Sequence, residues 1–387
     1  FGSMVGQGGA PIMAMKMGSG NEKEARQVLN NGFFMLLVLS AVLTSLFLLS
    51  KNTLLMWFGA SDATLSYANT YVTIYTAGTF FALISGGMNS FLIAQGFSGL
   101  GMATVVIGAI LNILLDPLFI FVFHMGVAGA AIATVISQIV SCLFVLGCLF
   151  SKRMPVRLGW GDFHLNVMKR IVTFGFSPFL ILASDSILLI VLNTVLQRYG
   201  GPGEGDTLVT CATIVQSYLL LITMPMGGIT LGSQPVVSFN YGKGDAERIK
   251  KAILCITGLC VTFCILMTIV TWTVSPVYVQ LFTEDPVILS RSVTYIKRFT
   301  FMIIPLAVQY PLVDETTALG KVKLALFCSA FRKFVFLTGL ILLPALLTAD
   351  AAFFSEPVAD VVSATMTSCL FFHFFPKILK EREKITI

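Results

Sequence analysis

Residues 8–20 read GGAPIMAMKMGSG, and residues 232–244 read GSQPVVSFNYGKG. Three glycines and one proline match at a constant separation of 224 residues, namely Gly8, Pro11, Gly18 and Gly20 against Gly232, Pro235, Gly242 and Gly244. The same separation carries Gly96, in IAQGFSG, onto Gly320, in TALGKVK. Such repetition across the chain indicates two copies of one structural unit.

The composition places both copies in a membrane. Hydrophobic residues make up 56% of the chain and charged residues 11%, and the mean hydropathy is +0.88. A water-soluble domain could not bury so much apolar surface. Spanning a bilayer takes about 20 apolar residues. We therefore predict an all-α polytopic membrane protein with spans near residues 33–50, 65–94, 101–123, 127–150, 171–197, 207–239, 252–274, 289–318, 324–347 and 353–376, preceded by the tail of another helix at 1–17.

Basic residues alternate between the predicted loops. They gather at residues 16–26, 152–170, 243–251 and 321–323 and after residue 376, whereas the intervening loops hold few. Lys and Arg concentrate on the cytoplasmic side of a membrane protein. We therefore expect a multi-pass protein of the plasma (inner) membrane whose C-terminus is cytoplasmic. The net charge of +6 reports this topology and does not indicate a nucleic-acid partner.

The repeats also predict the domain organisation. Six predicted spans separate Gly18 from Gly242, so both glycine-rich loops face one compartment and the six-helix lobes are parallel repeats about a pseudo-two-fold axis along the membrane normal. We predict an N-terminal lobe at 1–150, a charged cytoplasmic linker at 151–170, a C-terminal lobe at 171–376 and a basic cytoplasmic tail at 377–387. If the lobes are equal in length, the first helix and most of the second, roughly 50 to 60 residues, are missing before Phe1.

A duplicated helical bundle is typical of secondary transporters, and ionisable groups inside their spans are expensive and functional. Asn112 and Asp116 are four residues apart, so an amide and a carboxylate share one helix face, and Pro117 frees backbone carbonyls beside them. Asp185 lies in the span that follows the linker. Oxygen ligands suit a hard ion such as Na⁺, and a carboxylate in a dry site can carry a proton instead. The alternative for these residues is hydrogen bonding within a buried polar network.

Other charged residues lie in the later spans. Asp314 and Glu315 point about 100° apart on a helix, so at most one faces a central cavity squarely. They either bind substrate or form a gate, or they belong to a polar helix end that pairs with Lys321 or Lys323. Asp360 is expected to serve helix packing. The adjacent Arg332 and Lys333 are expected to reach the interface or to neutralise a buried acid such as Asp314.

The chain resembles the multidrug and toxic compound extrusion (MATE) transporters. The resemblance rests on the paired glycine-rich loops, LNILLDPLFIF at 111–121, GVAGAAIATVIS at 126–137, QPVVSFNYGKG at 234–244 and PVAD at 357–360. It implies twelve helices in two lobes and export of organic, often cationic, amphipathic compounds in exchange for Na⁺ or H⁺. Thr134 matches the threonine that this family sets against the amide–carboxylate pair, so Asn112, Asp116 and Thr134 resemble the cation site of the first lobe. Asp185 resembles the acid that sodium-coupled members carry in the seventh helix, and the family's first-helix acid would precede Phe1.

These interpretations leave alternatives open. A lipid-linked oligosaccharide or polysaccharide flippase of the same wider superfamily shares the paired lobes, but we see few cationic residues suited to a pyrophosphate. The sequence has neither H-E-x-x-H nor G-x-S-x-G, so we do not expect an enzyme. The eight cysteines form no C-x-x-C and are expected to pack in the spans. We expect no cofactor, no metal beyond a possible Na⁺, a small organic substrate, a surrounding bilayer and a monomer.

Overall fold

The structure, a computed structural model, describes residues 1–57 and 62–386, and most of these residues are α-helical. No strand occurs in these residues, so the predicted all-α class is confirmed. By packing, the chain divides into two compact units. We call Phe1–Phe179 unit 1 and Leu180–Ile387 unit 2.

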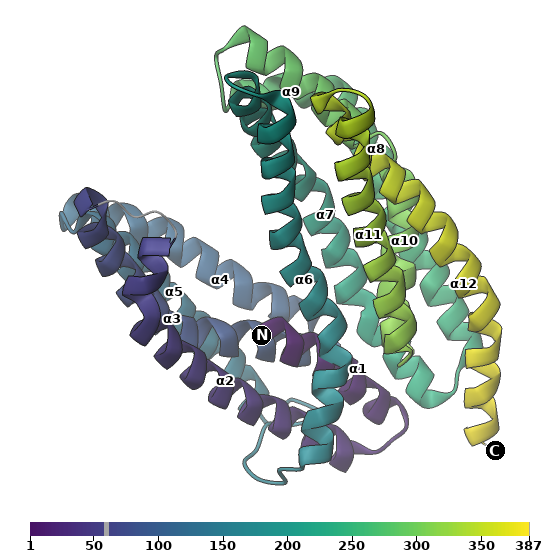
Figure 1. Cartoon of the computed structure of the whole chain (residues 1–387). Helices are drawn as coiled ribbons and strands as arrows, with labels where there is room; N and C mark the ends of the chain where they lie inside the picture. The colour runs from purple at the N-terminus through teal and green to yellow at the C-terminus, as the bar shows by residue number, and fades with distance from the viewer. Residues whose placement is uncertain (58–61, 387) are drawn as a thin grey trace. The chain divides into compact units, whose positions relative to one another are not determined.

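Unit 1 is a bundle built around α3, which packs against α1, α2 and α5, while α4 packs against α5 (Figure 1). Its elements are α1 (Gly2–Gly18), α2 (Glu22–Trp57), α3 (Asp62–Ala94), α4 (Ser98–Pro117), the π-helical turn η1 (Leu118–Val122), α5 (Gly126–Phe150) and the first part of α6 (Leu165–Gly200).

Unit 2 is built around α10, which packs against α7, α8, α11 and α12. Its elements are the remainder of α6, α7 (Glu204–Lys243), α8 (Ala246–Gln280), α9 (Pro286–Phe299), α10 (Ile303–Ala318), α11 (Val322–Leu346), the 3₁₀ turn η2 (Ala349–Phe354) and α12 (Ser355–Thr386). Aromatic rings fill part of its core, where Tyr295 stacks on Phe353 with 4.1 Å between the ring centroids.

The helices have the length and composition of membrane spans. In the described residues, nine helices are long and apolar enough to cross a bilayer, and α9 with α10 would make a tenth. Those two helices meet at a 51° bend, so the segment predicted as a span at 289–318 is a bent pair of helices. The reason is Pro305, whose missing N–H and bulky ring prevent one helix from running through the residues just before it.

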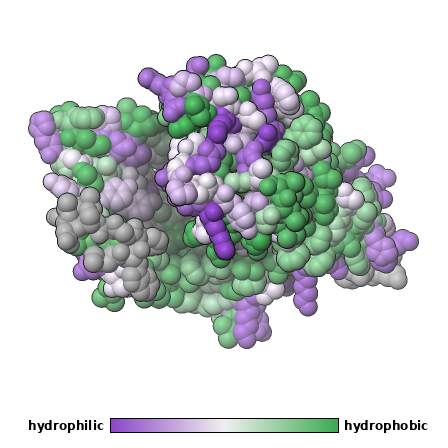
Figure 2. Space-filling model, turned by 45° about the horizontal axis from the view of Figure 1, so that its top comes forward, coloured by the Kyte–Doolittle hydropathy of each residue, from purple (hydrophilic) through white to green (hydrophobic). Residues whose placement is uncertain are grey.

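The surface is apolar, as a bilayer requires. Figure 2 shows broad hydrophobic areas on the face it presents. Large aliphatic and aromatic side chains are exposed in both units, among them Ile113, Leu254 and Phe372. In the described part of the chain this exposure is far more than isolated surface residues explain, so the helices face lipid over much of their length.

The repeated loops have the same local structure, as the sequence match predicts. The matched Gly20 and Gly244 both have left-handed backbones, with φ of 75° and 83°. The next residue closes each turn through its N–H, from Asn21 to the Lys16 carbonyl at 2.9 Å and from Asp245 to the Asn240 carbonyl at 3.0 Å. A side chain with a Cβ is strained at this φ, which is why glycine recurs at both positions.

Unit 1 holds the residues predicted as the linker. Asn30 and Asn31 of α2 accept hydrogen bonds from the backbone N–H groups of Gly159 and His164, at 2.9 and 2.8 Å. Gln95 accepts another from the Val156 N–H at 2.9 Å. Helix α6 begins at Leu165, so the last six residues assigned to the linker are helical.

Candidate functional site

Two glycines allow close packing of α5 against α4 and η1 around the candidate cation site of unit 1. A Cβ on Gly108 would lie 2.4 Å from the Ser141 hydroxyl, and a Cβ on Gly129 would lie 2.8 Å from the Phe119 carbonyl oxygen. Glycine is therefore needed at position 129, where a Cβ would meet the backbone of η1 (Leu118–Val122), whereas at position 108 the Ser141 hydroxyl would have to rotate away.

Between these two contacts, the three residues expected from the sequence come together. The Asn112 amide donates to the Asp116 carboxylate at 3.2 Å and lies 3.3 Å from the Thr134 hydroxyl, which itself donates to the Ala130 carbonyl at 3.0 Å. Asn112, Asp116 and Thr134 are each half-buried. We call these three residues the amide cluster.

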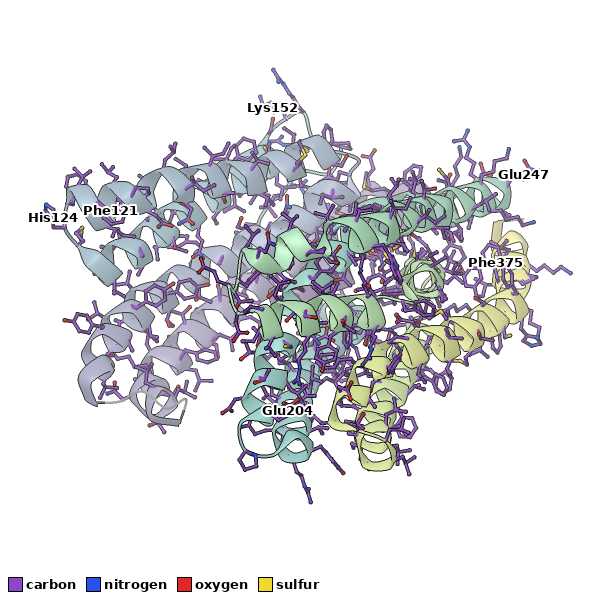
Figure 3. All side chains as sticks on the ribbon, turned by 90° about the horizontal axis from the view of Figure 1, so that it is seen from above. Phe121, His124, Lys152, Glu204, Glu247 and Phe375 are labelled. Carbon is purple, nitrogen blue, oxygen red and sulfur yellow. The ribbon has the colours of Figure 1, made fainter. Side chains whose placement is uncertain are left out.

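The backbone after the amide cluster is irregular. Helix α4 ends at Pro117, and the five residues of η1 form a π-helical turn. His124 then takes a positive φ of 52° before α5 begins. Figure 3 shows Phe121 and His124 at the end of unit 1 where this turn leads into α5. A π-helical turn beside a polar cluster is common at functional sites, because it leaves carbonyls outside the regular hydrogen-bond pattern.

The chemistry of the amide cluster is that of an oxygen-rich site. A carboxylate, an amide and a hydroxyl offer hard ligands, which Na⁺ prefers over softer metals. In the described part of the chain, no basic side chain forms an ion pair with Asp116, and no three His, Cys, Asp or Glu side chains converge as a metal cluster. A carboxylate without a paired base in the described residues has the chemistry of a site for a hard cation.

In unit 2, by contrast, several acidic side chains form ion pairs with basic side chains. Asp185 of α6 forms an ion pair with Lys333 of α11. The neighbouring Arg332 pairs with Glu356 and lies 2.9 Å from an oxygen of Asp360, both on α12. Arg332 and Lys333 thus neutralise acids, as one of the two sequence interpretations expected, but their partners are these three acids and not Asp314. We call the five residues the charged network.

The charged network adjoins a cavity inside unit 2. The cavity has a volume of about 480 Å³ and is lined by residues of α6, α7, α10, α11 and α12. Asp185, Arg332, Lys333 and Glu356 lie in its wall, together with leucines and the aromatic rings of Tyr310 and Phe336. A concave, mainly apolar space with a few charged groups has the character of a small-molecule site.

Asp314 and Glu315 are not among the residues that line this cavity. Glu315 is fully buried, and neither of its carboxylate oxygens has a hydrogen-bond partner among the described residues. Asp314 is half-buried, and its backbone carbonyl accepts from the Gln234 amide at 3.1 Å. The substrate or gate role expected for this pair stays a prediction.

One member of the charged network, Glu356, was missed by sequence reasoning. It lies four residues before Asp360, so the two carboxylates share a face of α12. This spacing of four residues could have identified Glu356 from the sequence. The pairing of Asp185 with Lys333 gave no such signal, because 148 residues separate the two partners.

Comparison with known proteins gives the family. A model of the MatE family matches residues 1–118 and 181–343, which is more than half of the chain. The chain belongs to the MATE family. As a MATE protein with at least nine candidate spans in its described residues, it is a multi-pass membrane protein.

Curated MATE relatives are named as export proteins and not as enzymes. The chain is 26% identical over 305 residues to the multidrug export protein MepA of Staphylococcus haemolyticus, a match that covers 78% of this chain and 65% of the relative. It is 23% identical over 300 residues to MepA of Staphylococcus saprophyticus, covering 77% of this chain and 65% of that one. The chain thus spans less than two thirds of the length of these relatives.

Solved structures share the MATE fold. One, described as the outward-facing conformation of a multidrug resistance MATE family transporter of the MOP superfamily, superposes with a TM-score of 0.91 at 23% identity, over 98% of this chain and 85% of that one. A MOP superfamily transporter from Pyrococcus furiosus, described as having a binding pocket of reversed polarity that suggests a different function, gives 0.91 at 22% identity, over 97% and 84%. At these identities the likeness shows the fold alone.

Proposed function

We propose that this protein is an antiporter that exports amphipathic organic compounds across the plasma membrane in exchange for Na⁺ or H⁺. The observation that carries the proposal is the amide cluster, in which Asn112, Asp116 and Thr134 meet between α4 and α5. The names of the MepA relatives support the export of drugs. The alternation of basic loops supports a cytoplasmic C-terminus.

The proposed mechanism is alternating access. The cation binds Asp116, whose carboxylate is oriented by the Asn112 amide, and the same amide also donates to the Thr134 hydroxyl. Coupling requires only that the ion and the exported compound favour different conformations by a few kcal/mol. Asp314 and Glu315 are proposed as a gate or as substrate ligands, on the ground that a fully buried carboxyl such as that of Glu315 is costly to keep without a function.

The test is dye efflux from vesicles that contain the full-length protein, under separately imposed Na⁺ and H⁺ gradients. We expect one of the two gradients to drive efflux. Asp116→Asn keeps the shape of the side chain but removes the negative charge that attracts a cation and the carboxylate that can carry a proton, so driven efflux should fall by about tenfold or more.

The matched control is Asp162→Asn, which changes an exposed aspartate of the same unit. It should leave efflux unchanged. Efflux of Asp116→Asn at the wild-type rate would refute the role given to Asp116. Wild-type efflux that follows neither gradient would refute the antiporter.

A further inference from the structure

The segment between α5 and α6 in unit 1 is an extended chain that packs on the helices. Met154, Val156 and Leu158 are buried, whereas Arg157, between the last two, is exposed. Alternate side chains of an extended chain point to opposite sides. One side of the segment therefore packs on unit 1, and the other side is open to the surroundings. We call residues 151–164 the strap.

Hydrogen bonds hold the strap in place. Side chains of α2 and Gln95 accept hydrogen bonds from three of its N–H groups. The Asn31 amide also donates to the Asp162 carbonyl at 2.9 Å. Further along, the Leu158 N–H donates to the Leu149 carbonyl at 3.0 Å. The outward side chains thus have fixed positions, so a ligand that binds them does not have to order a free loop, which would weaken its affinity.

Four aromatic rings gather where the strap meets α2. The Trp160 ring meets Phe33 and Phe34 edge-on, with 6.5 and 6.4 Å between the ring centroids, and its centroid lies 5.4 Å from that of Phe163. Trp160 is nevertheless 71% exposed. Tryptophan has an apolar ring and a polar N–H, so it prefers the boundary between lipid head groups and hydrocarbon. The four rings, which we call the aromatic cluster, mark this boundary.

The exposed side of α2 supports the same depth. Val38, Val42 and Leu46 are exposed and follow Phe34 in steps of four residues, so all four lie on one side of the helix. A continuous apolar stripe of this kind faces acyl chains. The aromatic cluster lies at the end of the stripe that adjoins the strap. The strap is therefore at the level of the head groups.

The strap carries positive charge at this level. It contains three basic residues, Lys152, Arg153 and Arg157, against one acid, Asp162. All three bases are exposed, and Figure 3 shows Lys152 reaching away from the ribbon. The Arg157 guanidinium donates to the Phe150 carbonyl at 3.3 Å, a neutral partner that leaves its charge uncompensated. Basic clusters at a membrane surface attract anionic lipids.

Arg26 of α2 adds a fourth positive charge beside the aromatic cluster. It is exposed, and a Cβ built on Gly159 would lie 2.6 Å from its Nη2 atom, so the guanidinium lies against the residue that precedes Trp160. In the described part of the chain, neither Arg26 nor the bases of the strap form ion pairs. A guanidinium can bind a phosphate through two parallel hydrogen bonds.

We propose that the strap and α2 form a binding site for an anionic phospholipid of the adjoining leaflet, such as phosphatidylglycerol. The phosphate binds Arg26, Trp160 packs where the head group meets the hydrocarbon, and an acyl chain follows the exposed stripe of α2. The bases of the strap favour an anionic head group over a neutral one. A soluble phosphate would match the charge but would leave the aromatic cluster and the stripe unused. The proposal goes beyond the proposed function and does not require export.

The test is photo-crosslinking of the full-length protein in liposomes. Phosphatidylglycerol or phosphatidylcholine, each with a diazirine on an acyl chain, is added at the same mole fraction, and peptide mapping measures the labelling of residues 33–50 and 151–164. In wild type, phosphatidylglycerol should label these residues at least about fivefold more than phosphatidylcholine, which corresponds to the attraction that about one basic residue at the surface contributes.

The double variant Arg26→Gln with Arg157→Gln should reduce this ratio to below about twofold and leave labelling by phosphatidylcholine as in wild type. Unchanged labelling by the neutral lipid shows that the variant is folded and inserted. The matched control is Arg198→Gln, which changes an exposed arginine at the other end of α6 and should keep the wild-type ratio. If labelling by the neutral lipid also changes in the double variant, Lys152→Gln with Arg153→Gln takes its place and should lower the ratio by about twofold or more.

Several results would overturn the proposal. Equal labelling by the two lipids in wild type, or a ratio that the variants leave unchanged, would show that no anionic head group binds here. Loss of phosphatidylglycerol labelling in excess inorganic phosphate at constant ionic strength would show that the site takes a soluble anion. Labelling by neither lipid would show that another chain, such as a second copy of this protein, covers the strap.

Discussion

The two units surround their exposed or half-buried carboxylates in different ways. In unit 1, Asp116 has an amide and a hydroxyl nearby, and both belong to neutral side chains. In unit 2, Asp185 is bound by an ammonium that is part of the protein. An acid with neutral neighbours can take up a mobile cation, whereas an acid with a tethered cation already has one. The difference supports the proposal that a coupling ion binds in unit 1.

The energetic cost of the two arrangements also differs. The amide cluster depends on hydrogen bonds of 3.2 and 3.3 Å between half-buried groups, and each such bond contributes about 1 kcal/mol. The charged network places a guanidinium between two buried carboxylates. Breaking such a network by removing one partner costs several times more than losing a neutral hydrogen bond.

The strongest test of this contrast is Arg332→Leu. It leaves Glu356 and Asp360 facing each other in the core of unit 2 without a cation. We expect a loss of about 3–5 kcal/mol in the free energy of unfolding, measured as denaturant or thermal unfolding of the purified protein in detergent.

A triple variant serves as the control for that measurement. Arg332→Leu combined with Glu356→Gln and Asp360→Asn removes all three charges together, so most of the lost stability should return. A single variant as stable as wild type would show that the charged network contributes little to unit 2.

The amide cluster could be predicted from the sequence because its geometry is local. Asn112 and Asp116 are one helical turn apart, and Thr134 follows in the next helix, only 22 residues from Asn112. Two antiparallel helices joined by a short turn can bring these positions together in few ways. Thr134 was identified only through the resemblance to the MATE family, and not through spacing.

The charged network could not be predicted in the same way. Which acid lies beside Lys333 depends on the rotation and depth of α6 and α11, which apolar composition does not determine. The sequence showed that Arg332 and Lys333 are in a span and need a counter-charge, but it offered several acids. Packing of the bundle then selected Asp185 for one and Glu356 with Asp360 for the other.

The fold shows the same division between local and non-local information. In the described residues, a helix or a bent helix pair lies at each span that hydropathy predicted. The repeat matched Gly96 with Gly320, and both have left-handed backbones, with φ of 89° and 78°. The bend between α9 and α10 was missed although Pro305 marks it. A proline inside an apolar run either kinks or ends a helix, and the sequence alone does not say which.

A smaller effect is expected from Asn112→Leu in unit 1. The change removes the amide that donates to Asp116 and lies near Thr134, so the free energy of unfolding should fall by about 1–2 kcal/mol. The apparent affinity for the coupling ion in gradient-driven efflux should fall by about tenfold, because the carboxylate loses the group that orients it. A loss of stability as large as that of Arg332→Leu would contradict the contrast between the units.

The smallest effect is expected from Thr134→Val, which keeps the shape of the side chain and removes one oxygen. Because a hydroxyl can coordinate Na⁺ but is not needed to protonate a carboxylate, the variant distinguishes the two coupling ions. If Na⁺ drives export, the Na⁺ concentration for half-maximal efflux at fixed pH should rise by about fivefold, the equivalent of one lost ligand of about 1 kcal/mol. If H⁺ drives export, the pH dependence of efflux should match wild type, since Asn112 still donates to Asp116. If Na⁺ drives efflux and the variant needs the same Na⁺ concentration for half-maximal efflux as wild type, Thr134 is not a ligand of the ion. Asn112 and Asp116 would then be the side chains that form the site.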